Sequence, residues 1–269
     1  MAFRFNPHTR SRSASLARRL GAAFAVSAVA IAALLRAPPA SADPQSPPGC
    51  GDWNDTGGRY FLWDQVKKRT PTDAGTNLQV VFPDPARDYG YAIHNGAPHG
   101  TPSTYDLLLI PTNRVSGIEC AKIWQPNALN LWQYARDAAR RLPPNTNIAL
   151  GINSAEMRDQ DQLHIHVSRL TDGAKADIDH QRQQITNDPA NWKNGIISVQ
   201  GKDFRALHVP DLGTNLFALL LQNVAPTDMF AQTLLVVPDP RGGYDALDSQ
   251  YSLSTHGARN IEFLLAKRP

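Results

Sequence analysis

The sequence predicts an α+β domain, an antiparallel sheet with packed helices, over residues 50–269. Short apolar runs, each bounded by Gly, Pro or Asn, follow one another closely, which is typical of antiparallel strands. Only a few segments repeat their apolar residues at helical spacing. Apolar content is 42% and charged content 19%, so the chain can form an ordinary globular core.

The first strands surround a Pro-Asp-Pro turn. Residues 77–82 and 89–93 read as strands on either side of it, because Pro and Asp favour turns. Residues 94–104 form a Gly/Pro-rich loop. Residues 105–111 are an apolar strand that Pro111 ends, since proline has no N–H to donate to a sheet.

The clearest helix follows, over residues 128–142. Its apolar residues recur at helical spacing, and Asn127 can cap its first turn. Pro143 and Pro144 end it. Two further strands then follow, at 146–153 and 162–168, with a polar loop between them.

The second part of the chain has a similar pattern. The sequence predicts strands at 194–200 and 204–209, a helix at 214–223 and a hairpin at 233–247. Residues 80–92 and 235–247 both contain an apolar strand, Pro-Asp-Pro and a Tyr four residues on. Shared turn chemistry and an internally duplicated half explain this equally well. The apolar stripe of 214–223 fits a lipid-facing helix or, more commonly, a core helix.

Residues 1–42 read as a signal peptide or an N-terminal membrane anchor. Basic residues 1–19 precede sixteen apolar residues at 20–35, and Ala40-Ser41-Ala42 fits a cleavage site. Either reading predicts an exported protein of the cell envelope or periplasm. In that compartment a disulfide between Cys50 and Cys120 is permitted, although their spacing does not show that they meet.

The charge of the remaining chain argues against nucleic acid as a partner. The full sequence has 27 basic and 24 acidic residues, for a net charge of +3. Residues 1–42 hold six of the arginines and no acid, so removing them leaves 21 against 24, or −3. A basic field for nucleic acid is therefore absent.

The strand at 162–168 carries the candidate chemistry. Because side chains alternate along a strand, Gln162, His164, His166 and Ser168 share one face, and Leu163, Ile165 and Val167 share the other. The two imidazoles fit an exposed, functionless pair or a metal site. No carboxylate follows in Val167–Leu170 as a third zinc ligand, so no metal is assigned.

Two phosphorus-directed readings remain. A two-histidine phosphoesterase needs a second His-x-Ser/Thr strand, and the only other match, 99–101, lies in a loop. Alternatively, one neutral imidazole attacks phosphorus and the other holds the phosphoryl oxygens. The polar loop at 153–161 would then offer backbone N–H groups to those oxygens.

The motifs, taken in order, resemble the bacterial CDP-diacylglycerol pyrophosphatases of the histidine-triad-like superfamily. That superfamily carries His-φ-His-φ-His-φ-φ, where φ is apolar, and QLHIHVS has Gln in the first place. The resemblance covers about 75–170 well and 195–265 loosely, and rests on YDLLLIPTNRVSGIE (105–119), the helix at 130–140, Asn153-Ser154 and QLHIHVS (162–168).

The resemblance implies a histidine-triad-like fold that hydrolyses CDP-diacylglycerol, a nucleotide-lipid held in a membrane, to CMP and phosphatidate. It implies His164 as nucleophile and His166 as the phosphate-binding residue that orients it. Gln162, Asn153 and Ser154 would contact the phosphates. No cofactor is implied with certainty, and a divalent cation requirement stays open, as does the oligomeric state.

One departure from the family pattern concerns the loop before the histidines. The family has a Gly-Arg-Thr/Ser-like stretch there, whereas this chain has Met157-Arg158-Asp159. Asp159 would repel a diphosphate unless it points away or binds a cation. The alternatives are therefore kept: an envelope nucleotide- or phosphate-binding protein of the same fold without catalysis, or a pyrophosphatase of another nucleotide conjugate.

Overall fold

A computed structural model describes residues 49–73, 77–96, 106–144, 147–254 and 256–266. The leader predicted at 1–42 lies outside these ranges. Within them, no helix has the length and apolarity needed to span a bilayer.

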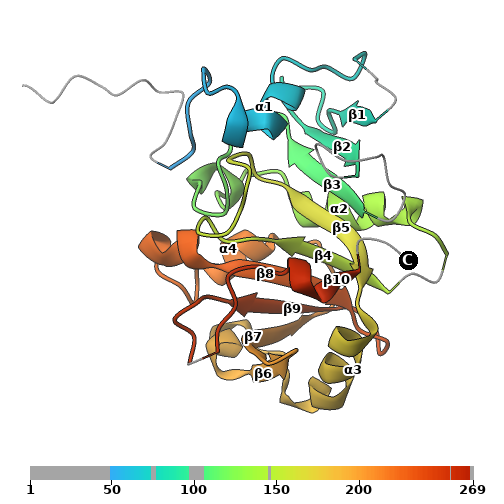
Figure 1. The fold of residues 1–269 in the computed structure, drawn as a ribbon, viewed down its shortest axis with the longest axis vertical. Helices are drawn as coiled ribbons and strands as arrows, with labels where there is room; N and C mark the ends of the chain where they lie inside the picture. Colours follow the sequence, from blue (N-terminus) through green and yellow to red (C-terminus); the bar gives the residue numbers. More distant parts are fainter. Residues whose placement is uncertain (1–48, 74–76, 97–105, 145–146, 255, 267–269) are drawn as a thin grey trace, which may run out of the picture. The chain divides into compact units, whose positions relative to one another are not determined.

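The described residues form a single ten-stranded sheet (Figure 1). Its strands follow the order β1-β2-β3-β5-β4-β8-β9-β7-β6, and each neighbouring pair is antiparallel. β10 pairs with the end of β5. The predicted α+β class is confirmed. The strands are β1 (Leu78–Val81), β2 (Tyr91–Asn95), β3 (Asp106–Pro111), β4 (Ile148–Ile152), β5 (Ile165–Leu170), β6 (Ile196–Val199), β7 (Lys202–Val209), β8 (Thr233–Pro238), β9 (Tyr244–Ser249) and β10 (Leu265–Ala266).

Within the described residues, four α-helices and seven short 3-10 helices accompany the strands. The α-helices are α1 (Phe61–Val66), α2 (Leu131–Ala138), α3 (Asp172–Gln181) and α4 (Leu216–Leu220). The 3-10 helices are η1 (Gly58–Tyr60), η2 (Ala121–Ile123), η3 (Ala139–Arg141), η4 (Arg182–Gln184), η5 (Pro189–Asn194), η6 (Pro226–Ala231) and η7 (Glu262–Leu264).

The two faces of the sheet are covered differently. Helices α2 and α4 pack together on one face, where the rings of Trp132 and Phe217 lie 5.1 Å apart in one large apolar cluster. The other face carries two separate apolar clusters. Helix α1 covers strands β1 to β3, and α3 with residues 258–265 covers the sheet from β4 onwards. A seam between these two clusters crosses β5.

Several predicted boundaries are wrong in detail. The helix predicted over 128–142 begins only at Leu131 and continues as a 3-10 turn after Ala138. Asn127 is not its cap; the preceding residue is Asn130, whose side chain donates to the carbonyls of Leu212 and Gly213 instead. Here a tertiary contact replaces the local cap. The strand predicted over 146–153 is limited to β4, and the helix over 214–223 to α4.

The apolar helix in the second part of the chain belongs to the core. The side chains of Leu216, Phe217, Leu219 and Leu220 in α4 are all buried, so the lipid-facing reading is wrong. Asn215 caps this helix by accepting a hydrogen bond from the Phe217 N–H at 3.1 Å.

The two Pro-Asp-Pro segments form antiparallel hairpins at different places in the sheet. The first joins β1 and β2 at one edge, and the second joins β8 and β9 in the interior. These positions are not equivalent in the sheet, so the likeness of the two segments is not itself evidence for a duplicated half.

A disulfide joins Cys50 to Cys120, with 4.6 Å between their Cα atoms. Both cysteines are fully buried. The bond holds residues 49–52 against the segment that carries Glu119. Residues 43–48 lie outside the described ranges.

Candidate active site

The two histidines lie in the seam between the two apolar clusters. Strand β5 begins at Ile165, so His166 is in the strand and His164 immediately precedes it. The prediction of one strand over 162–168 is therefore corrected. In register, His166 stands between Leu108 of β3 and Gly151 of β4. The two imidazole centroids are 5.1 Å apart, at 69° between the rings.

The predicted polar row exists, but it is buried. His164 is 9% exposed and His166 6%, and Gln162 and Ser168 are inaccessible to solvent. The sequence pattern suggested an open polar face. Instead α1 and the C-terminal segment flank the seam, and both faces of the strand are covered. Burying a polar group without a partner costs free energy, so the contacts of these side chains affect the stability of the fold.

His164 is held as a neutral ring with one free nitrogen. Its Nδ1 lies 2.8 Å from the backbone carbonyl oxygen of Gln162. A carbonyl only accepts, so Nδ1 carries the proton and Nε2 keeps its lone pair. Burial, and then the nearby His166, lower the pKa of His164 from 6.5 to about 4. The ring is therefore neutral at neutral pH, with a proton on Nδ1 and none on Nε2.

This lowered pKa predicts a pH-dependent contribution to stability. Between about pH 6.5 and 4, His164 binds a proton in the unfolded chain but not in the folded chain. The free energy of unfolding therefore falls as the pH falls. Relative to a His164→Asn variant, the wild-type protein should lose up to about 3 kcal/mol across this window. Urea unfolding at a series of pH values measures the difference.

Asp248 makes this comparison necessary. Burial raises its pKa to about 6, which changes stability in the opposite direction over an overlapping range. Asp248 is present in both proteins, so its effect cancels in the difference. A wild-type–variant difference that stays constant from pH 7 to 4 would contradict the assignment of a neutral, buried His164.

Two carboxylates flank His166. Asp106 Oδ1 is 3.9 Å from Nδ1, and Glu262 Oε1 is 3.7 Å from Nε2. Both separations exceed hydrogen-bond length, so the carboxylates act on the ring electrostatically. Sequence reasoning missed both residues. Asp106 had a signal, an acid at the start of an apolar strand, whereas Glu262 lies far away in the chain and had none.

Gln162 is fixed by four contacts. Its amide nitrogen donates to the carbonyls of Pro111 and Asn113 at 2.8 and 2.9 Å. Its amide oxygen accepts from Arg114 Nη1 at 3.1 Å and from the N–H of Val115 at 3.3 Å. The side chain therefore fastens the backbone carbonyl that orients His164 to the loop after β3.

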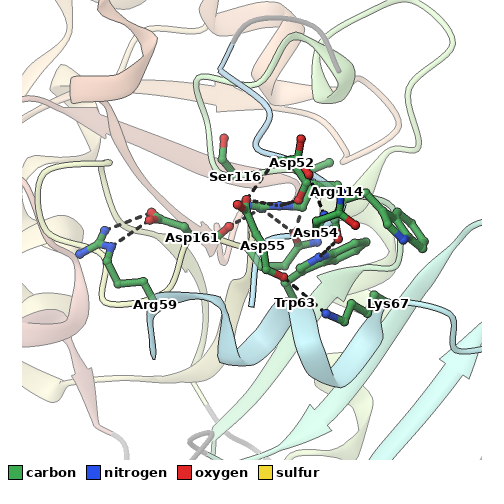
Figure 2. Close-up of polar contacts among 12 residues, drawn as sticks. Asp52, Asn54, Asp55, Arg59, Trp63, Lys67, Arg114, Ser116 and Asp161 are labelled. Atoms are coloured by element: carbon green, nitrogen blue, oxygen red, sulfur yellow. Dashed lines mark hydrogen bonds and ion pairs between the residues drawn. The ribbon is translucent and has the colours of Figure 1, made fainter. Parts of the chain in front are cut away.

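Arg114 connects this loop to the N-terminal stretch (Figure 2). Its guanidinium pairs with the carboxylate of Asp55 at 2.6 Å, and also donates to the backbone carbonyls of Asp52 and Asp161. It lies over the rings of Tyr60 and Trp63 at 5.5 and 5.7 Å. Only 3% of the Arg114 side chain is exposed, so it is a buried cation with paired donors.

A second buried arginine holds the loop before the histidines. Arg158 makes a two-pronged contact with Glu119, at 2.7 and 2.8 Å, and binds Asp161 at 2.9 Å. A Cβ at Gly117 would lie 2.2 Å from Arg158 Nη1, so only glycine allows this approach. Asp159 is exposed. Asp161, and not Asp159, is the residue whose carboxylate pairs with Arg158. Asp161 also pairs with Arg59.

Asn153 and Ser154 bind the C-terminal segment that covers the seam. Asn153 Nδ2 donates to Glu262 Oε1 at 2.7 Å, and its Oδ1 accepts from the Ile261 N–H at 3.0 Å. Ser154 donates to the Arg259 carbonyl through both its N–H and its hydroxyl. The polar atoms of both residues contact protein groups in this structure, and their contacts to phosphate stay a prediction.

The backbone N–H groups of the 153–161 loop are also largely used within the protein. Those of residues 154, 155, 157, 158 and 161 donate to backbone carbonyls. The expected row of free N–H donors for phosphoryl oxygens is therefore wrong for these five positions.

Among the described residues, one group could hold a metal ion: His208, Asp239 and Asp245. His208 is on β7, Asp245 is on β9, and Asp239 lies in the loop between β8 and β9. Both carboxylates already contact the guanidinium of Arg182, and Asp239 also contacts Arg241 at 2.7 Å. We assign no step to this group.

The protein is of the α+β class. Its antiparallel sheet holds a buried, neutral histidine just before one strand and a second histidine, flanked by carboxylates, within that strand. The family model described as CDP-diacylglycerol pyrophosphatase matches residues 59–267. The chain belongs to this CDP-diacylglycerol pyrophosphatase family.

Curated relatives agree with this placement. A protein of Mycobacterium bovis (strain BCG / Pasteur 1173P2) named CDP-diacylglycerol pyrophosphatase is 34% identical over 113 residues, covering 39% of this chain and 42% of that protein. A protein of the same name from Mycobacterium tuberculosis (strain ATCC 25177 / H37Ra) matches with the same identity and coverage. The chain thus spans less than half the length of these relatives in the match.

Proposed function

We propose that the protein hydrolyses the pyrophosphate bond of CDP-diacylglycerol to CMP and phosphatidate, with His164 as nucleophile. The observation that carries the proposal is the hydrogen bond from His164 Nδ1 to the Gln162 carbonyl, which leaves Nε2 free on a neutral ring. The family of the chain supplies the substrate class.

The chemistry divides into two displacements. Nε2 of His164 attacks the phosphorus of the cytidylyl group; the N–P bond forms, the bridging P–O bond breaks, and phosphatidate leaves. Water then attacks the same phosphorus, the N–P bond breaks, and CMP is released with a proton. His166 holds the phosphoryl oxygens during both steps, and Asp106 is a positioning residue for its ring.

Glu262 occupies a place that a phosphate oxygen would take. Its carboxylate accepts a hydrogen bond from Asn153 and lies 3.7 Å from His166 Nε2. A diphosphate beside Glu262 would be repelled, so substrate binding displaces this carboxylate. The side-chain amide of Asn153, which donates to Glu262 in this structure, then donates to the phosphate instead. This gives Asn153 its substrate-binding role. Ser154 holds the segment that moves, and Gln162 acts through His164.

We also infer a histidine-triad-like duplicated fold. Strands β2, β3, β4 and β5 have the sheet order 2-3-5-4 with α2 between the hairpins, and β6, β7, β8 and β9 have the order 6-7-9-8 with α4 between them. These two groups of four strands meet where β4 pairs with β8, with Gly151 opposite Leu235. By this relation Leu247 takes the place of His166, so only one site is formed.

Export is a further part of the proposal. The basic and apolar leader favours it, and the Cys50–Cys120 disulfide suits an oxidising compartment. We expect the native protein either to begin near Asp43 or to stay tethered through residues 20–35. When denatured without reduction, it should not react with alkylating agents at either cysteine. A full-length chain recovered soluble from the cytoplasm with two reactive thiols would contradict this.

A substrate comparison tests the proposed function. The wild-type protein should hydrolyse CDP-diacylglycerol faster than simple CDP-alcohols or dinucleotides. Faster hydrolysis of a soluble conjugate would instead support a pyrophosphatase of another nucleotide conjugate. Binding of these ligands without turnover would support an envelope binding protein of the same fold.

A further inference from the structure

Four large apolar side chains form an exposed cluster beside the histidine site. The structure describes six exposed large apolar side chains in all. Single apolar residues are normal on a surface, whereas a contiguous cluster marks an interaction site. The four are Met157, Phe230, Tyr251 and Phe263, exposed by 40, 43, 62 and 45%; we call them the apolar patch.

The members of the apolar patch line two adjoining hollows. Met157, Tyr251 and Phe263 line a cavity of about 190 Å³, and Phe230 and Tyr251 line one of about 270 Å³. Tyr251 is shared by both. The N–H of Ala155 donates to the Phe230 carbonyl at 2.8 Å, which joins the loop before the histidines to this surface. The two hollows are therefore neighbours, on the surface next to this loop.

The C-terminal segment connects the apolar patch to the histidines. Arg259 lines the first hollow, while its carbonyl accepts hydrogen bonds from Ser154. Three residues further on, Glu262 is 3.7 Å from His166. Three residues span at most roughly 10 Å, so the segment that lines the first hollow also reaches His166.

Two cations, Arg259 and Lys202, line the first hollow, whereas two acids, Glu156 and Asp228, line the second, so the cationic side of the apolar patch is the one with Tyr251 and Phe263. The Arg259 guanidinium lies 4.2 Å from the centroid of the Tyr251 ring, and Lys202 lines the same hollow. Arg259 also approaches Glu156 at 3.9 Å, but both side chains are substantially exposed, so this pair is weak. Aromatic rings beside Arg and Lys suit the boundary between lipid chains and anionic headgroups.

The geometry points to a docking surface for an anionic phospholipid bilayer. The apolar patch enters the boundary of the headgroups and acyl chains, and Arg259 and Lys202 face lipid phosphates. A diphosphate lipid held in the bilayer has its phosphates at headgroup depth, so this docking would present them to His164 without extracting the lipid. The substrate's identity rests on the proposed function, whereas the docking can be measured without turnover.

Fluorescence quenching tests the docking directly. In the full chain, Phe263→Trp places a reporter in the apolar patch. Ile196→Trp is the matched control, because Ile196 is exposed by 40% on the edge strand β6 and lines neither hollow. With anionic vesicles that carry brominated acyl chains, the tryptophan added at 263 should be quenched and the one at 196 should not. Equal quenching at both positions, or none at 263, would overturn the proposal.

A kinetic comparison tests its consequence for the reaction. A Tyr251→Ser/Phe263→Ser double variant should hydrolyse CDP-diacylglycerol in vesicles about tenfold more slowly, and a soluble CDP-alcohol at nearly the wild-type rate. Ile196→Ser should change neither. Full vesicle activity in the double variant would refute the docking role. If the wild-type protein hydrolyses neither substrate, the proposed function fails, and quenching alone decides the docking.

Discussion

His164→Asn should lower the turnover of CDP-diacylglycerol by about 10⁴-fold or more, the scale on which enzymes lose activity with their covalent nucleophile. Asparagine can still donate to the Gln162 carbonyl, but it has no imidazole nitrogen to attack phosphorus. The fold should survive, with a stability change of about 1–2 kcal/mol. Steady-state kinetics and urea unfolding of the same preparation measure both effects.

Neighbouring residues provide the controls for this substitution. Leu163→Ala, in the large cluster on the opposite face, should cost about 2–5 kcal/mol of stability and leave the turnover of the folded fraction near normal. His166→Ala should lower turnover by about 10²–10³-fold, as for one transition-state contact. Near wild-type turnover in His164→Asn would exclude nucleophilic catalysis by this residue.

Arg114→Ala should destabilise the protein by about 3–5 kcal/mol, the cost of removing one partner from a buried ion pair. The substitution leaves the Asp55 carboxylate without its 2.6 Å contact, and removes a donor from the Gln162 amide oxygen. Because Gln162 orients His164, turnover of the remaining folded protein should also fall. Urea unfolding and kinetics at a temperature where the variant is folded separate the two losses.

Arg140→Ala is the matched control for Arg114. Its side chain is 78% exposed and pairs with Asp137 at 3.4 Å, so its removal should change stability by less than about 1 kcal/mol. Equal losses in the two variants would contradict a buried network that supports the histidines. Arg114→Lys should recover little, because a lysine cannot reproduce the guanidinium's several directed hydrogen bonds.

Those parts of the fold that depend on local pattern could be predicted. Strand β3 and the β8–β9 hairpin are apolar runs with proline or glycine at their ends, and the structure places them close to the predicted bounds. The alternation along β5 also holds, because it depends only on strand geometry. Helix α3 was missed because it buries only Ala174 and Ile178, which is too weak a stripe to recognise.

The parts of the site that depend on contacts distant in sequence could not be predicted. Glu262 reaches His166 from almost a hundred residues away, because Gly151 lets the C-terminal segment lie close to the sheet: a Cβ there would be 2.5 Å from Ile261. The row of Gln162, His164, His166 and Ser168 is also buried by segments distant in sequence. Nothing in residues 162–168 shows which segments flank them, and so an open face was expected.

The proposed mechanism requires a covalent bond between His164 and the cytidylyl phosphorus. Wild-type protein, mixed with CDP-diacylglycerol and quenched at alkaline pH during the first turnover, should carry one cytidylyl group on the peptide that contains His164. Peptide mass spectrometry identifies the modified residue, and His164→Asn is the matched control. A cytidylyl group on another residue, or complete single turnover with no modified peptide at any time, would contradict the claim.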